Sequence, residues 1–421
     1  MKKRIIYNIL GGALLASALT ACDQFEAARE AGEIHPMTIT VVPQLNIEGL
    51  PAPDELTIRF QNFSENVDIT VTAPKGQESV TAEGIIPGLY TVTVSGKVVT
   101  DDGDYYLSGN EVNFPIVEEG TEISIPVRGL VAGKLVFSEF YYCGSKTANG
   151  AYWFRDQFQT LYNNTANETF YLDDNIYWAQ LEPNNATTNL PAWPEEDGGN
   201  FAYAIHVWKF PGSGRELPLK PGEAAVISQI GINNKMESFN PLSPVDNSTA
   251  EFEYYVGNAN YGDNPALNME CVFCDGTRVY NNRLQMLLAV FGPAIVIFKV
   301  PDGVTYDPVE DPQYWTNKVG TTSTTRYARI PVDWILDALE TGQNETMMAA
   351  KRVPSVLDAG MTYVGDTYLG LSVARKKVGA HSDGTPVLQD TNNSTEDFDR
   401  GLVPEHRRYG AKVPSWSPSL K

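Results

Sequence analysis

Residues 134–143 read Lys-Leu-Val-Phe-Ser-Glu-Phe-Tyr-Tyr-Cys, and residues 156–164 read Asp-Gln-Phe-Gln-Thr-Leu-Tyr-Asn-Asn. Both stretches are short, rich in aromatic and aliphatic side chains, and bounded by glycine or asparagine, which is typical of strands. We expect them to be the first two strands of a domain that extends from residue 134 to about residue 400.

These two stretches resemble the opening of lamin-tail-like domains, which have an immunoglobulin-like β-fold. In those domains a strand with a Ser-Glu pair precedes an Asp-x-Phe-x-Glu-Leu-Tyr-Asn motif. Later segments follow in the expected order, with 169–172 as a strand, 219–227 as a Pro-Gly turn and strand, 372–376 as the closing strand and 390–398 as an Asp-Thr-Asn loop. The matching motif residues are Asp156, Phe158, Leu161, Tyr162 and Asn163, whereas Thr160 stands where the motif has glutamate.

The span from 134 to 400 is much longer than such a domain needs, so the resemblance implies long loop insertions. On these segments the chain resembles Bacteroidota surface lipoproteins of the DUF4876 type, a family of unassigned function.

Residues 37–128 carry a different pattern, in which β-branched and polar residues alternate within short segments. Such alternation places one face of each segment in a core and the other in water, and it predicts a β-sandwich. The turn and strand at 86–92 resemble immunoglobulin-like modules of the transthyretin or carboxypeptidase-regulatory type, which usually act as spacers. Residues 129–133 are expected to be a short hinge. The alternating segments are 37–42, 56–60, 67–71, 89–94 and 122–127.

The predicted fold class is therefore all-β, with one or two short helices. The helix candidate is 330–339, where Pro331 would occupy the first turn and Trp334, Ile335, Ala338 and Leu339 would share one face. The apolar run 284–300 is interrupted by Gly292 and Pro293, so we expect two buried strands there.

The amino terminus predicts export to the cell envelope. Basic residues at 2–4 precede an apolar run at 5–19, which is shorter than the roughly 20 residues of a membrane-spanning helix. The segment 19–22, Leu-Thr-Ala-Cys, resembles the lipobox of bacterial lipoproteins. That resemblance implies removal of residues 1–21 as a signal peptide and alkylation of Cys22 with diacylglycerol, and the alternative is an ordinary signal peptide. Residues 22–36 would be a flexible tether, whose acidic residues loosely match the signal for the outer face of the outer membrane.

Composition limits the partners. The chain carries 31 Lys and Arg against 52 Asp and Glu, a formal charge of −21. Loss of residues 1–21 removes three positive charges and gives 28 − 52 = −24. Such a chain repels phosphate backbones, which excludes nucleic acid, and no basic cluster follows the signal to attract anionic lipid. The membrane contact is therefore expected through the lipid on Cys22.

Four cysteines are present, Cys22, Cys143, Cys271 and Cys274. The single Cys-x-x-Cys pair at 271–274 lacks the further ligands of a zinc site and does not open a helix as a redox pair does. We expect a structural disulfide, either between Cys271 and Cys274 or between one of them and Cys143.

No catalytic motif is visible. The histidines show no metal-ligand spacing, and His206 is expected to be an ordinary strand residue. Asp390, Asn392, Ser394 and Glu396 alternate as in a calcium loop, but the sixth and twelfth positions lack the required Gly and Glu. We therefore expect an Asx turn at this position, and no metal or cofactor in the protein. A calcium site at 390–396 is the alternative.

Aromatic residues in polar loops are candidates for stacking on a ligand. They are Trp193, Tyr254, Tyr255 and Trp315. The basic tail at 401–421 is expected to lie back on the acidic body.

The sequence leads to three functional hypotheses. The first is a non-enzymatic, surface-exposed lipoprotein of the outer membrane that binds a glycan or another nutrient, where the resemblance to such lipoproteins implies a TonB-dependent receptor as partner. The second is a structural or adhesive envelope protein. The third is a glycan hydrolase, which would need two converging carboxyl groups.

Overall fold

The computed structural model describes residues 35–47, 49–62, 64–100, 103–131, 133–281, 284–348 and 350–421. The predicted signal peptide, Cys22 and most of the tether lie outside these ranges. The all-β class is confirmed, because strands dominate the described residues and helices there are one four-residue α-helix, α2 (Ser394–Asp397), and short 3-10 turns. None of these helices has the length and apolar character of a membrane span.

The first domain is a single curled sheet of seven strands in the order β3-β2-β5-β6-β7-β1-β4. Its buried face encloses one apolar core to which all seven strands contribute. The strands are β1 (Met37–Asn46), β2 (Glu55–Asn62), β3 (Val67–Pro74), β4 (Val80–Ile85), β5 (Gly88–Thr100), β6 (Gly103–Ile116) and β7 (Glu122–Val131).

Five of these strands coincide with the alternating segments predicted from the sequence, and β4 and β6 were not predicted. β6 contains polar residues and Gly109, which weaken a strand signal. A side chain at Gly109 would lie 2.1 Å from the carbonyl oxygen of Pro126 in β7, so glycine is needed there for close packing of the two strands.

The second domain contains two larger sheets. One has the order β18-β17-β16-β11-β8-β26-β29, and the other has β21-β22-β14-β13-β20-β23 with β19 paired to β14. The first is formed by β8 (Leu135–Tyr141), β11 (Phe158–Asn163), β16 (Ala224–Ser228), β17 (Phe252–Glu253), β18 (Leu267–Asn268), β26 (Ser372–Arg375) and β29 (Phe398–Leu402). The second is formed by β13 (Ile176–Leu181), β14 (Phe201–Lys209), β19 (Glu270–Cys274), β20 (Ile295–Lys299), β21 (Trp315–Thr316), β22 (Tyr327–Pro331) and β23 (Ile335–Leu339).

The second domain also contains two-stranded sheets, and short 3-10 turns follow the strands. Two-stranded pairs are β9 (Ser145–Lys146) with β10 (Tyr152–Trp153), β12 (Phe170–Tyr171) with β15 (Pro218–Leu219), β24 (Thr341–Gly342) with β25 (Thr362–Tyr363), and β27 (Lys377–Ala380) with β28 (Pro386–Leu388). The 3-10 turns are η1 (Glu195–Asp197), η2 (Asn247–Thr249), η3 (Pro312–Tyr314), η4 (Val332–Trp334), η5 (Glu345–Met347), η6 (Arg408–Gly410) and η7 (Pro418–Leu420).

The main core of the second domain includes side chains of both sheets, such as Phe137 of β8 and Trp178 of β13. A second apolar cluster contains Ala179 of β13 and Val296 of β20, whose neighbours Trp178 and Ile297 belong to the main core. Because successive strand residues point to opposite faces, the sheet that contains β13 and β20 is buried on both sides. This explains why its strands read as continuous apolar runs.

The predicted helix at 330–339 is wrong. The segment forms the end of β22, the turn η4 and the strand β23, which pairs with β20 from Leu339 opposite Ile295 to Ile335 opposite Phe298. Ala338 and Leu339 belong to different apolar clusters, on opposite faces, as a strand requires and a helix face does not. Pairing in a sheet covered on both sides outweighed the local helical pattern.

The prediction of two strands within 284–300 is half correct. Residues 295–299 form β20, but the part before Gly292 is irregular and contributes Met286 and Leu288 to the core without pairing. Burial of an apolar segment therefore did not require a strand.

The basic tail packs against the second domain. Arg408 makes two hydrogen bonds of 2.9 Å to the buried carboxylate of Glu139, and Arg407 is paired with buried Glu251. Trp416 donates its indole N–H to the carbonyl of Pro218 at 2.7 Å. These contacts neutralise two buried carboxylates.

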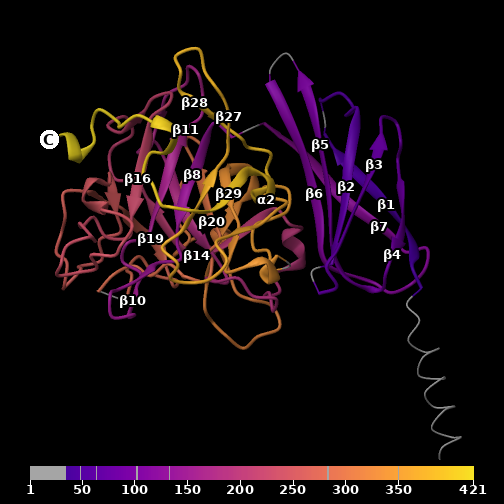
Figure 1. The fold of residues 1–421 in the computed structure, drawn as a ribbon, viewed down its shortest axis with the longest axis horizontal. Coiled ribbons are helices and arrows are strands. Elements are labelled where there is room, and N and C mark those ends of the chain that lie inside the picture. The colour runs from indigo at the N-terminus through magenta and orange to yellow at the C-terminus, as the bar shows by residue number, and fades with distance from the viewer. Residues whose placement is uncertain are drawn as a thin grey trace, which may run out of the picture.

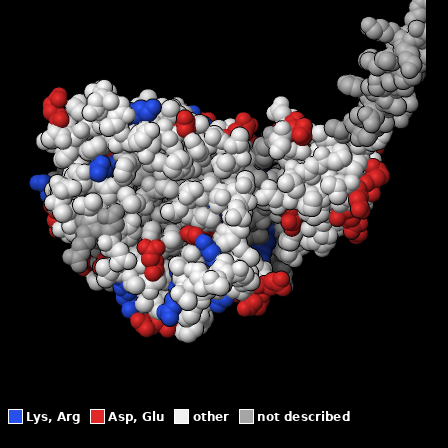
Figure 2. All heavy atoms as spheres, turned by 90° about the horizontal axis from the view of Figure 1, so that it is seen from below, with Lys and Arg blue, Asp and Glu red and all other residues white. Residues whose placement is uncertain are grey.

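The two domains lie side by side, and the α2 segment is on the side of the second domain that faces β5 and β6 (Figure 1). Lys and Arg are scattered among Asp and Glu on the face shown in Figure 2 and form no basic patch there.

Candidate binding groove between the two domains

The outer face of the first sheet carries a regular set of polar side chains. Because core and outer residues alternate along each strand, every second residue of β2, β5 and β6 points away from the core. Strand pairing places Thr57, Ser95 and Ser108 in one row and Arg59, Thr93 and Asn110 in the next. We call these six residues the polar grid.

The opposite wall comes from residues 389–397, which we call the α2 loop. Asn393 caps α2 by accepting from the backbone N–H of Thr395 at 3.1 Å. Thr395 in turn donates its hydroxyl to the carbonyl of Met361 at 3.1 Å. A side chain at Gly360 would lie 2.5 Å from the nitrogen of Thr395, so glycine allows the loop to approach this closely.

A buried arginine anchors the α2 loop to the second domain. Arg375, on β26, is 1% exposed and pairs with Asp390 and Asp397 of the loop at 2.9 and 3.4 Å and with Asp337 of β23 at 2.9 Å. Asp397 also accepts from the backbone of Thr391 at 2.8 Å. The wall of the groove is therefore fixed by a charge cluster inside the second domain.

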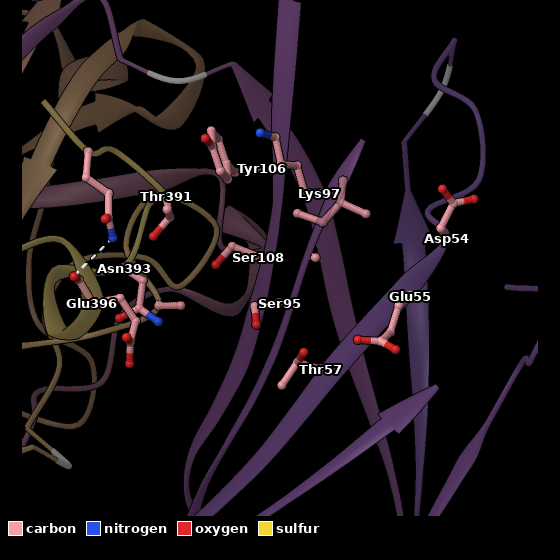
Figure 3. A pocket seen from close by; sticks show the side chains of 14 residues that line it. Asp54, Glu55, Thr57, Ser95, Lys97, Tyr106, Ser108, Thr391, Asn393 and Glu396 are labelled. Atoms are coloured by element: carbon pink, nitrogen blue, oxygen red, sulfur yellow. Dashed lines mark hydrogen bonds between the residues drawn. The ribbon is translucent and has the colours of Figure 1, made fainter. Parts of the chain in front are cut away.

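Three direct contacts join the polar grid to the second domain. Asn110 donates to the carbonyl of Ala359 at 3.0 Å, Ser108 donates to the carbonyl of Ser355 at 3.4 Å, and Arg59 reaches Glu396 at 3.3 Å. Between them lies a groove of two chambers of about 540 and about 280 Å³. Thr57, Ser95, Ala359, Asn393 and Glu396 line both chambers, and Figure 3 shows the larger one with these walls.

Ion pairs or a ring contact hold several of the charged groups near the groove. Arg59 makes two hydrogen bonds to Asp68, at 2.8 and 2.6 Å, which raise the pKa of Arg59 and lower that of Asp68. Asp54 pairs with Lys75 at 2.9 Å, and the ammonium of Lys97 lies 5.4 Å from the ring centre of Tyr106. The remaining lining is dominated by hydroxyl and amide groups.

The buried carboxyl groups give the fold an unusual pH dependence. Burial raises the pKa of Asp337 and Asp397, and it raises the pKa of Asp156 to about 6. These groups bind more protons in the folded than in the unfolded chain between about pH 4 and their folded pKa, so their contribution to stability is lost as pH rises through that window. Burial lowers the pKa of His406 to about 4. The contribution of this histidine to stability therefore increases as pH rises, opposite to that of the carboxyl groups.

Burial also raises the pKa of Glu139, Glu251 and Glu253. The carboxyl groups with a raised pKa therefore outweigh the one histidine, and we expect Tm to fall as pH rises from 5 to 8. The loss in free energy of unfolding should be on the order of 2 kcal/mol. Thermal melts at one ionic strength would measure it. A Tm that is flat or rises over this range would contradict the assignment of protonated buried carboxyls.

The predicted stacking aromatics do not meet in one site, and none of them lines the groove. The assignment of Tyr254 is wrong, because this ring is 0% exposed and lies 5.1 Å from both Trp178 and Trp208. Trp193 is stacked on Tyr203, with ring centres 4.1 Å apart. The assignments of Trp315 and Tyr255 remain predictions. The Trp315 ring centre lies 4.2 Å from the guanidinium of Arg326, and Tyr255 is half-buried.

The other predicted residues are placed as follows. Cys271 and Cys274 form a disulfide, and Cys143 is a buried free thiol. His206 is buried on β14, with Nδ1 3.2 Å from the amide oxygen of Gln180. The alternating oxygens at 390–396 diverge, because Asp390 pairs with Arg375 whereas Ser394 donates to Asp358. Among the described residues no group of three or more His, Cys, Asp or Glu is placed to hold a metal ion.

The polar grid is not predicted as a site by the sequence. Alternation did place Thr57, Arg59, Thr91, Thr93 and Ser95 on one outer face, which is the available signal. It could not show that the α2 loop, about 300 residues further along the chain, covers this face.

Comparison with known proteins gives a family. The model of the DUF4876 family, described as a protein of unknown function, matches residues 220–405. The crystal structure of a DUF4876 family protein from Bacteroides thetaiotaomicron VPI-5482 is 45% identical, covers 91% of this chain and 100% of its own, and has a TM-score of 0.67.

A protein from Bacteroides eggerthii DSM 20697, described as a "putative cell adhesion protein", is 10% identical over 65% of this chain and 77% of its own. Its TM-score of 0.14 is too low to support any argument. No curated protein matches the chain. The extended 45% identity over the whole of the first structure shows that this chain belongs to the DUF4876 family.

Proposed function

We propose that the protein is a lipid-anchored, non-enzymatic binding protein of the outer membrane, with the groove between its domains as the binding site. The observation that carries this proposal is the groove itself, whose walls come from both domains. Ligand sites often occur at domain interfaces, where two surfaces can enclose a ligand. The charged groups Arg59, Asp54 and Glu396 are engaged in ion pairs, which suits recognition better than proton transfer.

The anchor in this proposal is Cys22. Two acyl chains of a diacylglycerol hold a protein on a bilayer, whereas one chain binds only reversibly. The first domain would then stand between the membrane and the second domain, with the groove between the two domains. Exposure at the cell surface and a TonB-dependent receptor as partner belong to the same proposal, and they fit a protein that captures a nutrient for a transporter.

Replacing Cys22 by Ser should move nearly all of the protein from the membrane to the soluble fraction, because the lipid has no other attachment site. Fractionation followed by mass spectrometry of the mature amino terminus would measure this. Cys143→Ala is the control, since it removes a different thiol and should leave the protein on the membrane. Membrane retention of Cys22→Ser, or an unmodified mature terminus in the wild type, would contradict lipid anchoring.

The transporter partner has a separate test. Purification of the anchored protein from mildly solubilised outer membranes should recover a β-barrel receptor in near-equal amount. Recovery of the protein without a barrel would favour the adhesive alternative. Protease treatment of intact cells would show which leaflet carries it, because only a surface-exposed protein is cleaved.

A further inference from the structure

We propose that the groove binds an uncharged, polyhydroxylated ligand, a carbohydrate, across the Thr57 and Ser95 row of the polar grid. The inference deepens the proposed function and rests on it for the choice of the groove as the binding site. It adds the chemical class of the ligand and names Thr57 and Ser95 as two side chains that bond to it.

The hydroxyl groups of Thr57 and Ser95 are free to bind a ligand. The two residues are directly opposite on β2 and β5, and both line both chambers. Within the described part of the chain neither side chain makes a hydrogen bond, whereas Ser108 in the same row donates to Ser355. Neighbouring strands lie about 4.8 Å apart, so two different hydroxyl groups of one ligand can each bond to one of these side chains.

A hydroxyl group donates one hydrogen bond and accepts others, so a wall of hydroxyls pairs best with a ligand that also does both. On the facing α2 loop, the amide of Asn393 offers N–H donors. The amide of Gln389 donates to Glu396 and Asp397 and offers its oxygen as an acceptor. Sugars offer such groups along their length. The Tyr106 ring at the edge of the larger chamber adds a flat surface that a sugar ring can contact.

The charges argue against an anionic ligand. Arg59 is held by Asp68 and Glu396, so an anionic ligand would have to displace a carboxylate from it. Asp54, Glu55 and Glu396 line the groove and repel anions, in agreement with the net charge of −21. The chambers of about 540 and about 280 Å³ together suit a short oligosaccharide.

The test is calorimetric titration of the mature chain from residue 22 with neutral gluco-, xylo-, manno- and galacto-oligosaccharides of about four to six units. Oligogalacturonides serve as the acidic counterpart. We expect binding to at least one neutral series and none to the acidic one. The double variant Thr57→Val/Ser95→Ala should weaken that binding about tenfold or more without lowering Tm, because it removes hydroxyls that bond to nothing else in the described structure.

Thr81→Val/Ser124→Ala is the matched control, since both residues are exposed on strands of the same sheet and neither lines the groove. It should bind as the wild type does. The inference is overturned if no neutral oligosaccharide binds, if the acidic series binds better, or if the groove variant binds as tightly as the control. Release from the membrane by Cys22→Ser is measured independently, so failure of the anchor and failure of the ligand class remain distinguishable. Mass spectrometry of the recovered sugar would separately reveal hydrolysis.

Discussion

Replacing Arg375 by Met should destabilise the protein by about 3–5 kcal/mol. The side chain is 1% exposed and pairs with Asp337, Asp390 and Asp397. Its removal leaves three buried carboxyl groups without a cation, and it also leaves the carbonyls of Phe137 and Gln389 without their donor. Denaturant unfolding of the purified variant would measure the loss.

The deficit of Arg375→Met should be smaller at pH 5 than at pH 8, since protonated carboxyl groups need no cation. Arg326→Met is the matched control. Arg326 is exposed and lies over the Trp315 ring, so its loss should change stability by less than about 1 kcal/mol. Equal losses in the two variants, or a deficit independent of pH, would show that the charge cluster does not hold the α2 loop in place.

The sequence predicted five of the seven strands of the first domain because these strands have one buried face and one face in water. In β2 the alternation of Leu56, Ile58 and Phe60 with polar neighbours is visible in the printed sequence and corresponds to the observed burial. The second domain was harder, since the sheet around β13 is covered on both faces and its strands lack alternation. Residues 330–339 also lack the alternation of apolar and polar residues typical of a strand, so their apolar residues matched the spacing of a helix face.

The site was less predictable than the fold. Asp390, Asn392 and Glu396 suggested a cation, and the cation that Asp390 meets is the side chain of Arg375 rather than a metal ion. Nothing in the spacing within 390–396 indicates an arginine on another strand. Likewise, the grid residues on β2 and β5 are ordinary for an outer sheet face, and only the tertiary approach of the α2 loop makes them walls of a groove.

The second large effect concerns Tyr254, which should act on stability and not on ligand binding. Tyr254→Ala should cost about 3–5 kcal/mol, because it removes a fully buried ring that packs between Trp178 and Trp208 in the main core. It also removes the hydroxyl that accepts from Gln159. Tyr254→Phe keeps the ring and loses only this hydrogen bond, so it should cost about 1 kcal/mol.

The adjacent residue provides the control for this experiment. Tyr255 is half-buried and belongs to none of the apolar clusters of the second domain, so Tyr255→Ala should lower the free energy of unfolding by less than about 1 kcal/mol. Denaturant melts of the three variants at one pH would separate the contributions. A small effect of Tyr254→Ala would mean that the ring is not part of the core, and an effect as large at Tyr255 would show that residues 254–255 act through the backbone. The sequence around Tyr254 is rich in polar residues, and it indicated an exposed loop. The residues next to this ring in space belong to the apolar core between the two sheets, which the sequence pattern does not show.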